Sequence, residues 1–183
     1  MEVYVMTNIR IFNPIRVALL IFFAAVPALS QVNPTGTPRP AAVPPGKIQL
    51  PAQYVYERRR GKDSHLGAMV RSDGFTIGHD IGRMAANYAA KYFPEHFDRL
   101  RKQTHLNPES VETDIQTLQG KIVWRQRQRI NGDEVMVVLL KDSTLIASFV
   151  NSDANFVAKA DTSDKIGDFF LIVLTYQPPG KER

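Results

Sequence analysis

Two sets of arginines have a spacing that suits the binding of an anion. The first ends one expected strand and the second alternates along another: Arg58, Arg59 and Arg60, then Arg125, Arg127 and Arg129. Because side chains alternate along a strand, the second set shares one face. The planar guanidinium group forms paired hydrogen bonds with phosphate, sulfate or carboxylate. We therefore predict an anion-binding surface that uses Arg58, Arg60, Arg125, Arg127 and Arg129. The alternative is a solvated strand face whose arginine stems cover apolar side chains.

A second candidate site is the corner that we expect between a strand and a helix near residue 80. Gly78 and Gly82 would let the backbone come close to an anion that faces the first helical N–H groups. His79 and Asp80 could hold a metal together with another histidine. The histidine and glycine spacings match no metal, dinucleotide or phosphate-loop motif, so we predict neither a metal nor a cofactor. The alternative is that Asp80 caps the helix and the glycines serve turns.

The patterns of catalytic residues favour a binding module over an enzyme. The chain has no Gly-x-Ser-x-Gly elbow and no cysteine nucleophile. Its closely spaced acids Glu112 and Asp114 would point to different sides of a helix, which does not suit shared acid–base work. We therefore predict no catalytic residue. A small metal- or anion-dependent enzyme centred on residues 74–82, or a subunit of an assembly, is the alternative.

The first thirty residues have the pattern of a secretory signal. Arg10 and Arg16 precede an apolar run at residues 17–26, and small residues precede a cleavage point after Ser30. A membrane helix needs about 20 apolar residues, so we expect no transmembrane segment after cleavage. The predicted location is the periplasm or the extracellular space. There an acidic polysaccharide, a lipid headgroup or an acidic protein is a better candidate partner than nucleic acid. Translation could start at Met1 or Met6.

The rest of the chain divides into a linker, one domain and a short tail. Residues 31–52 hold half of the prolines and few charges or large apolar side chains, which predicts a flexible linker. Residues 53–178 suffice for one hydrophobic core. Because the chain has no cysteine, this core forms without disulfides. We expect residues 179–183 to be a disordered tail.

The first half of the domain reads as a β-meander followed by helices. Turn residues separate three expected strands, at residues 53–60, 65–71 and 75–78. A helix from Asp80 to Phe93 should follow, and Pro94 should start a second helical segment, since proline cannot continue the first. Asn107 has the position of a helix N-cap before a third helix that ends near Gly120.

A hairpin around Asn131-Gly132 is the clearest signal in the second half. This dipeptide favours a two-residue turn, which places Arg129 opposite Glu134 and Trp124 opposite Leu139. The flanking strands are expected at residues 122–130 and 134–140. A third strand at 145–150 should put Leu145, Ala147 and Phe149 on the arginine face, so the middle strand would be apolar on both sides.

The last apolar segment, at residues 163–177, fits a buried helix or a central strand, and the helix is slightly favoured. The fold class that follows is α+β. It has an antiparallel sheet built from the meander, the hairpin and the third strand, with two to three central helices. Because the middle strand is apolar on both sides, both faces of the sheet should be at least partly covered.

Overall fold

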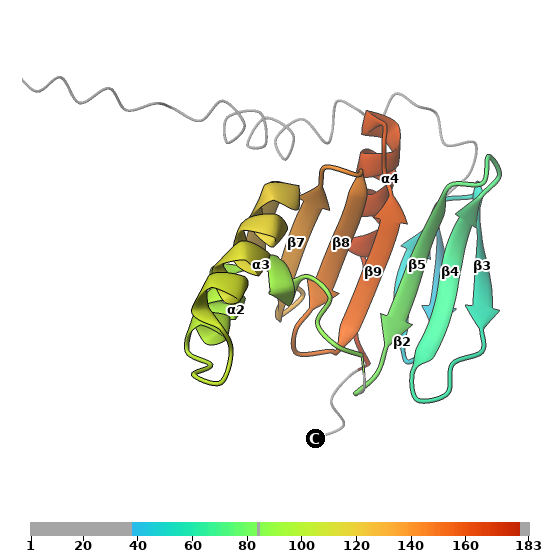
Figure 1. The fold of residues 1–183 in the computed structure, drawn as a ribbon. Helices are drawn as coiled ribbons and strands as arrows, with labels where there is room; N and C mark the ends of the chain where they lie inside the picture. The colour runs from blue at the N-terminus through green and yellow to red at the C-terminus, as the bar shows by residue number, and fades with distance from the viewer. Residues whose placement is uncertain (1–37, 84, 180–183) are drawn as a thin grey trace, which may run out of the picture. The chain divides into compact units, whose positions relative to one another are not determined.

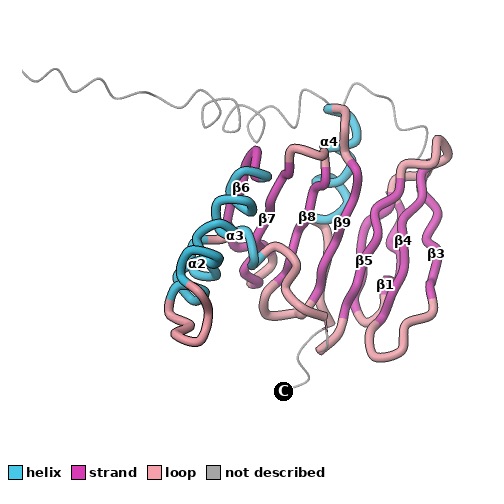
Figure 2. The backbone as a smooth tube through the Cα atoms, in the orientation of Figure 1, coloured by secondary structure: helices cyan, strands magenta, loops and turns pink. Residues whose placement is uncertain are grey.

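The computed structural model describes residues 38–83 and 85–179 and has an α+β fold (Figure 1). Seven strands form one antiparallel sheet in the order β3-β4-β5-β9-β8-β7-β6, and β1 and β2 form a separate hairpin (Figure 2). The strands are β1 (Arg39–Val43), β2 (Gly46–Leu50), β3 (Tyr54–Arg59), β4 (His65–Arg71), β5 (Thr76–Ile81), β6 (Ile122–Ile130), β7 (Asp133–Leu140), β8 (Thr144–Phe149) and β9 (Ala154–Lys159).

Helices cover both faces of this sheet, as the sequence predicts. They are the 3-10 helix η1 (Ala90–Tyr92), α2 (Pro94–Arg101), α3 (Pro108–Lys121) and α4 (Ser163–Val173). In the view of Figure 1, α2 and α3 lie in front of the sheet, while α4 and β2 lie behind it. We call these two sides the α3 face and the α4 face. None of the described helices is long and apolar enough to cross a membrane.

The α4 face carries the main hydrophobic core. Val137, Ala147 and Phe156 from neighbouring strands pack there with Phe169 of α4 and Ile48 of the β1–β2 hairpin. The opposite face carries a second cluster, in which Met136, Val138, Leu140 and Ile146 meet the side chains of Ala89, Tyr92 and Phe93. The middle strands are therefore buried on both sides, which explains why two layers are needed.

Strand β9 joins the two halves of the sheet, and no pattern in the sequence predicted it. It pairs with β5 on one side and with β8 on the other. Its residues enter from a tight turn in which Asp153 has a φ of 47°. Because β9 bridges the β3–β5 meander and the β6–β8 meander, seven strands form one sheet rather than two.

The Asn131-Gly132 hairpin has the predicted register. Arg129 lies opposite Glu134 and Trp124 opposite Leu139. A register shift between Ile122 and Trp124 is the one departure in this pair of strands, because a bulge moves Ile122 to the other side of the sheet. Ile122 therefore packs with the α3-face cluster, whereas Trp124 packs against the α4-face core.

The predicted orientation of the third strand is wrong. Leu145, Ala147 and Phe149 lie on the α4 face, opposite the side that Arg125 and Arg127 occupy. The reason is the turn before β8, which has three residues, 141–143, rather than the expected four. A one-residue difference exchanges the two faces of a strand.

The predicted helix from Asp80 to Phe93 is also wrong. Strand β5 continues to Ile81, which pairs with His65 and with Ala154, and among the described residues between Ile81 and Pro94 only η1 is helical. Backbone hydrogen bonds to β4 on one side and to β9 on the other hold the end of β5 in the sheet. This pairing outweighs the helical periodicity of the local sequence. The predicted segment from Pro94 and the helix capped by Asn107 are confirmed as α2 and α3.

The predictions for the linker before the domain and for the helix at its C-terminal end had different outcomes. Residues 39–50 of the predicted linker form the β1–β2 hairpin, in which Val43, Ile48 and Leu50 are buried in the core. Burial of alternate apolar side chains stabilises this segment in spite of its prolines. The favoured C-terminal helix is confirmed as α4. The predicted signal, the linker up to residue 37 and most of the predicted tail lie outside the described residues.

Replacing Phe156 by alanine should lower the free energy of unfolding by about 3–5 kcal/mol, because it opens a cavity in the α4-face core. The ring is fully buried and lies edge-on to Phe149 and to Tyr176, with centroids 5.7 and 5.2 Å away. Urea unfolding measures the change. The control is Val55→Ala on β3, where the side chain is 58% exposed and the loss should stay within about 0.5 kcal/mol.

Candidate functional site

Arginines gather around a cavity at the loop between β3 and β4. The cavity has a volume of about 570 Å³ and is lined by residues 58–65, which we call the arginine loop. Four cations line it, together with the single carboxylate of Asp63: Arg58, Arg59, Arg60 and Lys62. Within the described part of the chain, none of these four side chains forms a hydrogen bond or an ion pair. The loop therefore offers unpaired positive charge to a ligand.

Two glycines allow the arginine loop its shape. A Cβ at Gly61 would lie 2.2 Å from the carbonyl oxygen of Ser64, so only glycine fits this close passage of the backbone. Gly82 follows β5 with a φ of +147°, and Ser64 packs against it with its Cα 3.4 Å from the position of a Cβ. The Gly82 N–H donates to the carbonyl of Asp153 at 2.9 Å, which fixes the point where the loop rests.

A buried histidine lies beside the arginine loop on the α4 face. His79 is 5% exposed, and its Nε2 lies 3.1 Å from the hydroxyl oxygen of Tyr56, with the two rings stacked. The pair fits because Gly67 has no side chain, since a Cβ there would lie 2.4 Å from Nε2. Arg58 is the cross-strand partner of Gly67, so this pair adjoins the first arginine of the loop. Burial lowers the pKa of His79 to about 4.

The β6 arginines are far from the arginine loop and are largely engaged. β3 and β6 are the two opposite ends of the strand order, so the five predicted arginines do not share one surface. Arg125 donates to the carbonyl of Tyr92 and lies over the rings of Phe93 and Phe97. Arg127 forms ion pairs of 3.1 Å with each of two carboxylates, those of Glu95 and Glu134. Arg129 is exposed at the end of this row.

The predicted corner site does not form as a corner. Gly78, His79 and Asp80 belong to β5, and His79 and Asp80 point to opposite faces of the sheet. Asp80 accepts a hydrogen bond of 2.5 Å from the hydroxyl of Tyr88, so it holds the following loop rather than a helix start. Among the described residues, no group of three or more histidines and acids is placed to hold a metal ion. Gly82 shapes the arginine loop, as described above.

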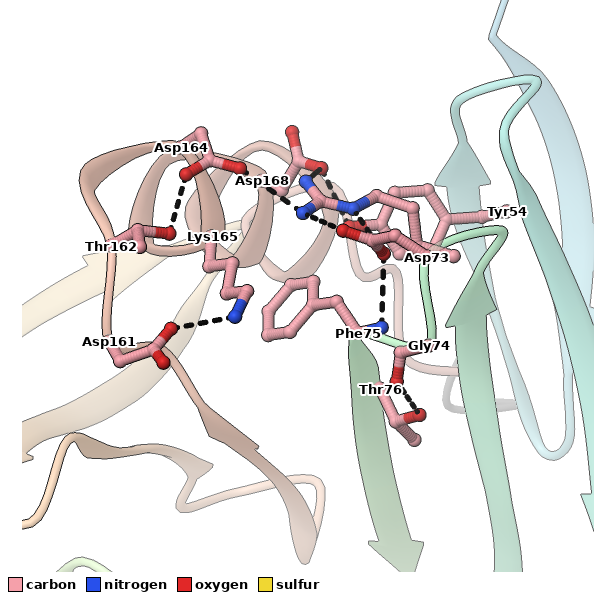
Figure 3. Close-up of polar contacts among 11 residues, drawn as sticks. Tyr54, Asp73, Gly74, Phe75, Thr76, Asp161, Thr162, Asp164, Lys165 and Asp168 are labelled. Carbon is pink, nitrogen blue, oxygen red and sulfur yellow. Dashed lines mark hydrogen bonds and ion pairs between the residues drawn. The ribbon is translucent and has the colours of Figure 1, made fainter.

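The sequence reasoning missed a polar cluster around Arg71. Its guanidinium group is mostly buried and pairs with Asp73, Asp164 and Asp168 at 2.6, 3.1 and 2.8 Å. Tyr54 also donates to Asp168, at 2.7 Å (Figure 3). The hydrogen bond from Arg71 holds the pKa of Asp73 well below its ordinary value. These residues are up to 114 positions apart in sequence, so no local pattern could reveal them.

The Arg71 cluster joins the start of α4 to the turn between β4 and β5. It borders a second open cavity of about 560 Å³, whose lining includes Asp73, Phe75 and Lys165. Lys165 is paired with Asp161 at 2.7 Å and lies over the ring of Phe75. Each charge that the cluster brings to this cavity already has a partner within the protein. The cluster therefore fastens α4 to the sheet, whereas the arginine loop leaves its charges available.

The burial of His79 should make the free energy of unfolding depend on pH in mildly acidic solution. Because the pKa of His79 in the folded protein lies below the ordinary histidine value of 6.5, the unfolded chain binds the proton more readily. The contribution of neutral, buried His79 to the stability of the fold is therefore present above pH 6.5 and is lost as the pH falls towards 4. The free energy of unfolding should drop by about 2 kcal/mol between pH 7 and pH 5 on this account. Urea unfolding at both pH values checks the drop.

His79→Gln should flatten this pH dependence, since glutamine does not titrate in the range. Tyr56→Phe is the matched control and should keep the dependence, because burial rather than the Tyr56 hydroxyl is the first cause of the shift. If the free energy of unfolding fell equally with pH in the wild type and in His79→Gln, other titrating groups would be responsible for the pH dependence.

The comparisons with known proteins leave the site to be interpreted from its own residues. No protein-family model matches the chain, no curated protein matches its sequence, and no solved structure matches its fold.

Proposed function

We propose that this chain is an exported, non-enzymatic binding module that recognises an anionic ligand through the arginine loop and works at or outside the cell envelope. The observation that carries the proposal is the set of four cations around one cavity that form no hydrogen bond or ion pair with the described residues. Cations without protein partners keep their full capacity to bind an external anion. Export is supported by the basic, apolar and small-residue pattern of the first thirty residues.

The arginine loop is a better ligand site than the β6 row, although both consist of arginines. At β6, two of the three guanidinium groups are engaged with Tyr92, Glu95 and Glu134. A ligand would have to displace those partners, and the loss of their hydrogen bonds would offset much of the binding free energy. At the arginine loop no such exchange is needed. The row on β6 is therefore assigned to packing between the sheet, η1 and α2.

The triple variant Arg58→Ser, Arg59→Ser, Arg60→Ser should elute from a heparin-type resin at clearly lower salt than the wild type. Heparin serves as a general sulfated probe, and attraction between exposed charges weakens as salt rises. Elution of the triple variant at the wild-type salt concentration would contradict the proposal.

The matched control removes three cations elsewhere: Lys102→Ser, Lys121→Ser, Lys141→Ser. These side chains are exposed, lie on or next to α2, α3 and β7, and have the same total charge as the three loop arginines. The control should elute close to the wild type. If both triple variants shift equally, retention follows net charge alone and the arginine loop has no special role.

A further inference from the structure

The arginine loop has a defined backbone shape, which simple attraction between charges does not require. Gly61 brings its backbone so close to the Ser64 carbonyl that no other residue fits, and Ser64 in turn rests against Gly82. A mobile cationic segment could have any sequence of lysines and arginines. This loop has instead one position, Gly61, at which only glycine fits, and it packs against Gly82, whose φ of +147° favours glycine, so its conformation is specified along with its charge.

The cations point in different directions around the cavity. Arg58 pairs with Gly67 and Arg59 with Leu66, so their side chains leave the strand on opposite faces of the sheet. Arg60 and Lys62 follow in the turn itself. In addition, the backbone N–H groups of Lys62, Asp63 and Ser64 donate to no other backbone group in the described ranges. Successive free N–H groups in a turn are a known form of anion-binding concavity.

The positive surface is short. Along β3 the residue before Arg58 is the exposed acid Glu57, and Val55, on the same face as Glu57, is exposed and apolar. Along β3 the cations therefore end at Arg58 and do not continue as a track, and the exposed Arg83 follows Gly82, against which Ser64 packs. A long polyanion that lies along β3 would find no second set of charges in line with the first, whereas one compact anionic group needs no such track.

From these observations we infer that the arginine loop binds one compact oxyanion, a phosphate or sulfate group, through its preformed geometry. This inference deepens the proposed function and rests on it. Tetrahedral oxyanions match the guanidinium fork and accept further hydrogen bonds from backbone N–H groups. Such a group can be carried by a free phosphate compound or by a lipid headgroup, and the recognition chemistry is the same for both.

The test separates geometry from charge by using Gly61→Ala, which keeps all four cations but distorts the loop. Calorimetric titration with inorganic phosphate and with sulfate, at constant ionic strength, should give saturable binding to the wild-type chain. Gly61→Ala should weaken this binding at least tenfold. Gly120→Ala on α3 is the control, because a Cβ there meets nothing within 4 Å, and it should bind as the wild type does.

A second measurement covers the case in which Gly61→Ala disturbs the fold. In the wild-type chain, the amide resonances of residues 60–65 should shift with added phosphate, and those of residues 125–129 should not. Binding of vesicles that contain phosphatidylglycerol, in competition with free phosphate, distinguishes a lipid headgroup from a soluble compound, and either source supports the inference.

Two results would overturn the inference. One is the absence of saturable binding of both phosphate and sulfate by the wild type. The other is equal binding by the wild type and by a folded Gly61→Ala variant. In either case the salt-dependent retention on heparin could still be lost in the triple arginine variant. The proposed function would then stand as attraction to general negative charge, without a formed oxyanion site.

Discussion

The strands at the middle of the sheet are apolar on both faces, and the rest of the structure follows from covering them. Val137 and Val138 are neighbours on β7 and are both fully buried, one on each side of the sheet. A single layer of helices would leave half of this surface in water, at a cost of about 25 cal/mol for each Å² exposed. The α4 layer and the α3 layer are two parts of the same solution, achieved without a disulfide.

Sequence patterns were reliable where the determining interactions are close along the chain. The Asn131-Gly132 turn defines the register of its hairpin, and Asn107 caps α3 by accepting from the N–H groups of Glu109 and Ser110. They failed where distant strands compete for a segment. Residues after Asp80 have helical periodicity, but pairing of β5 with both β4 and β9 extends the strand. The β1–β2 hairpin likewise depends on a core that proline content alone cannot reveal.

The same distinction applies to the candidate site. Arg58 and Arg60 can be recognised from the sequence because the arginine loop is one continuous stretch, whereas the contribution of Gly61 and Gly82 to its shape depends on contacts in the folded chain, such as that of Ser64 with the distant Gly82. The β6 arginines have an equally suggestive spacing, but their partners come from η1, α2 and β7, which no spacing rule contains. An arginine pattern therefore indicates charge, and only the contacts show whether that charge is available.

The arginines also lie on the two strands at which the sheet ends. In the part of the chain that the structure describes, β3 pairs with β4 alone and β6 with β7 alone, so each has one open edge. Open edges are templates for pairing with another chain, and charged side chains on them oppose such aggregation. The arginines at both edges therefore oppose the pairing of this sheet with the sheet of another copy of the chain, an effect that is independent of any ligand.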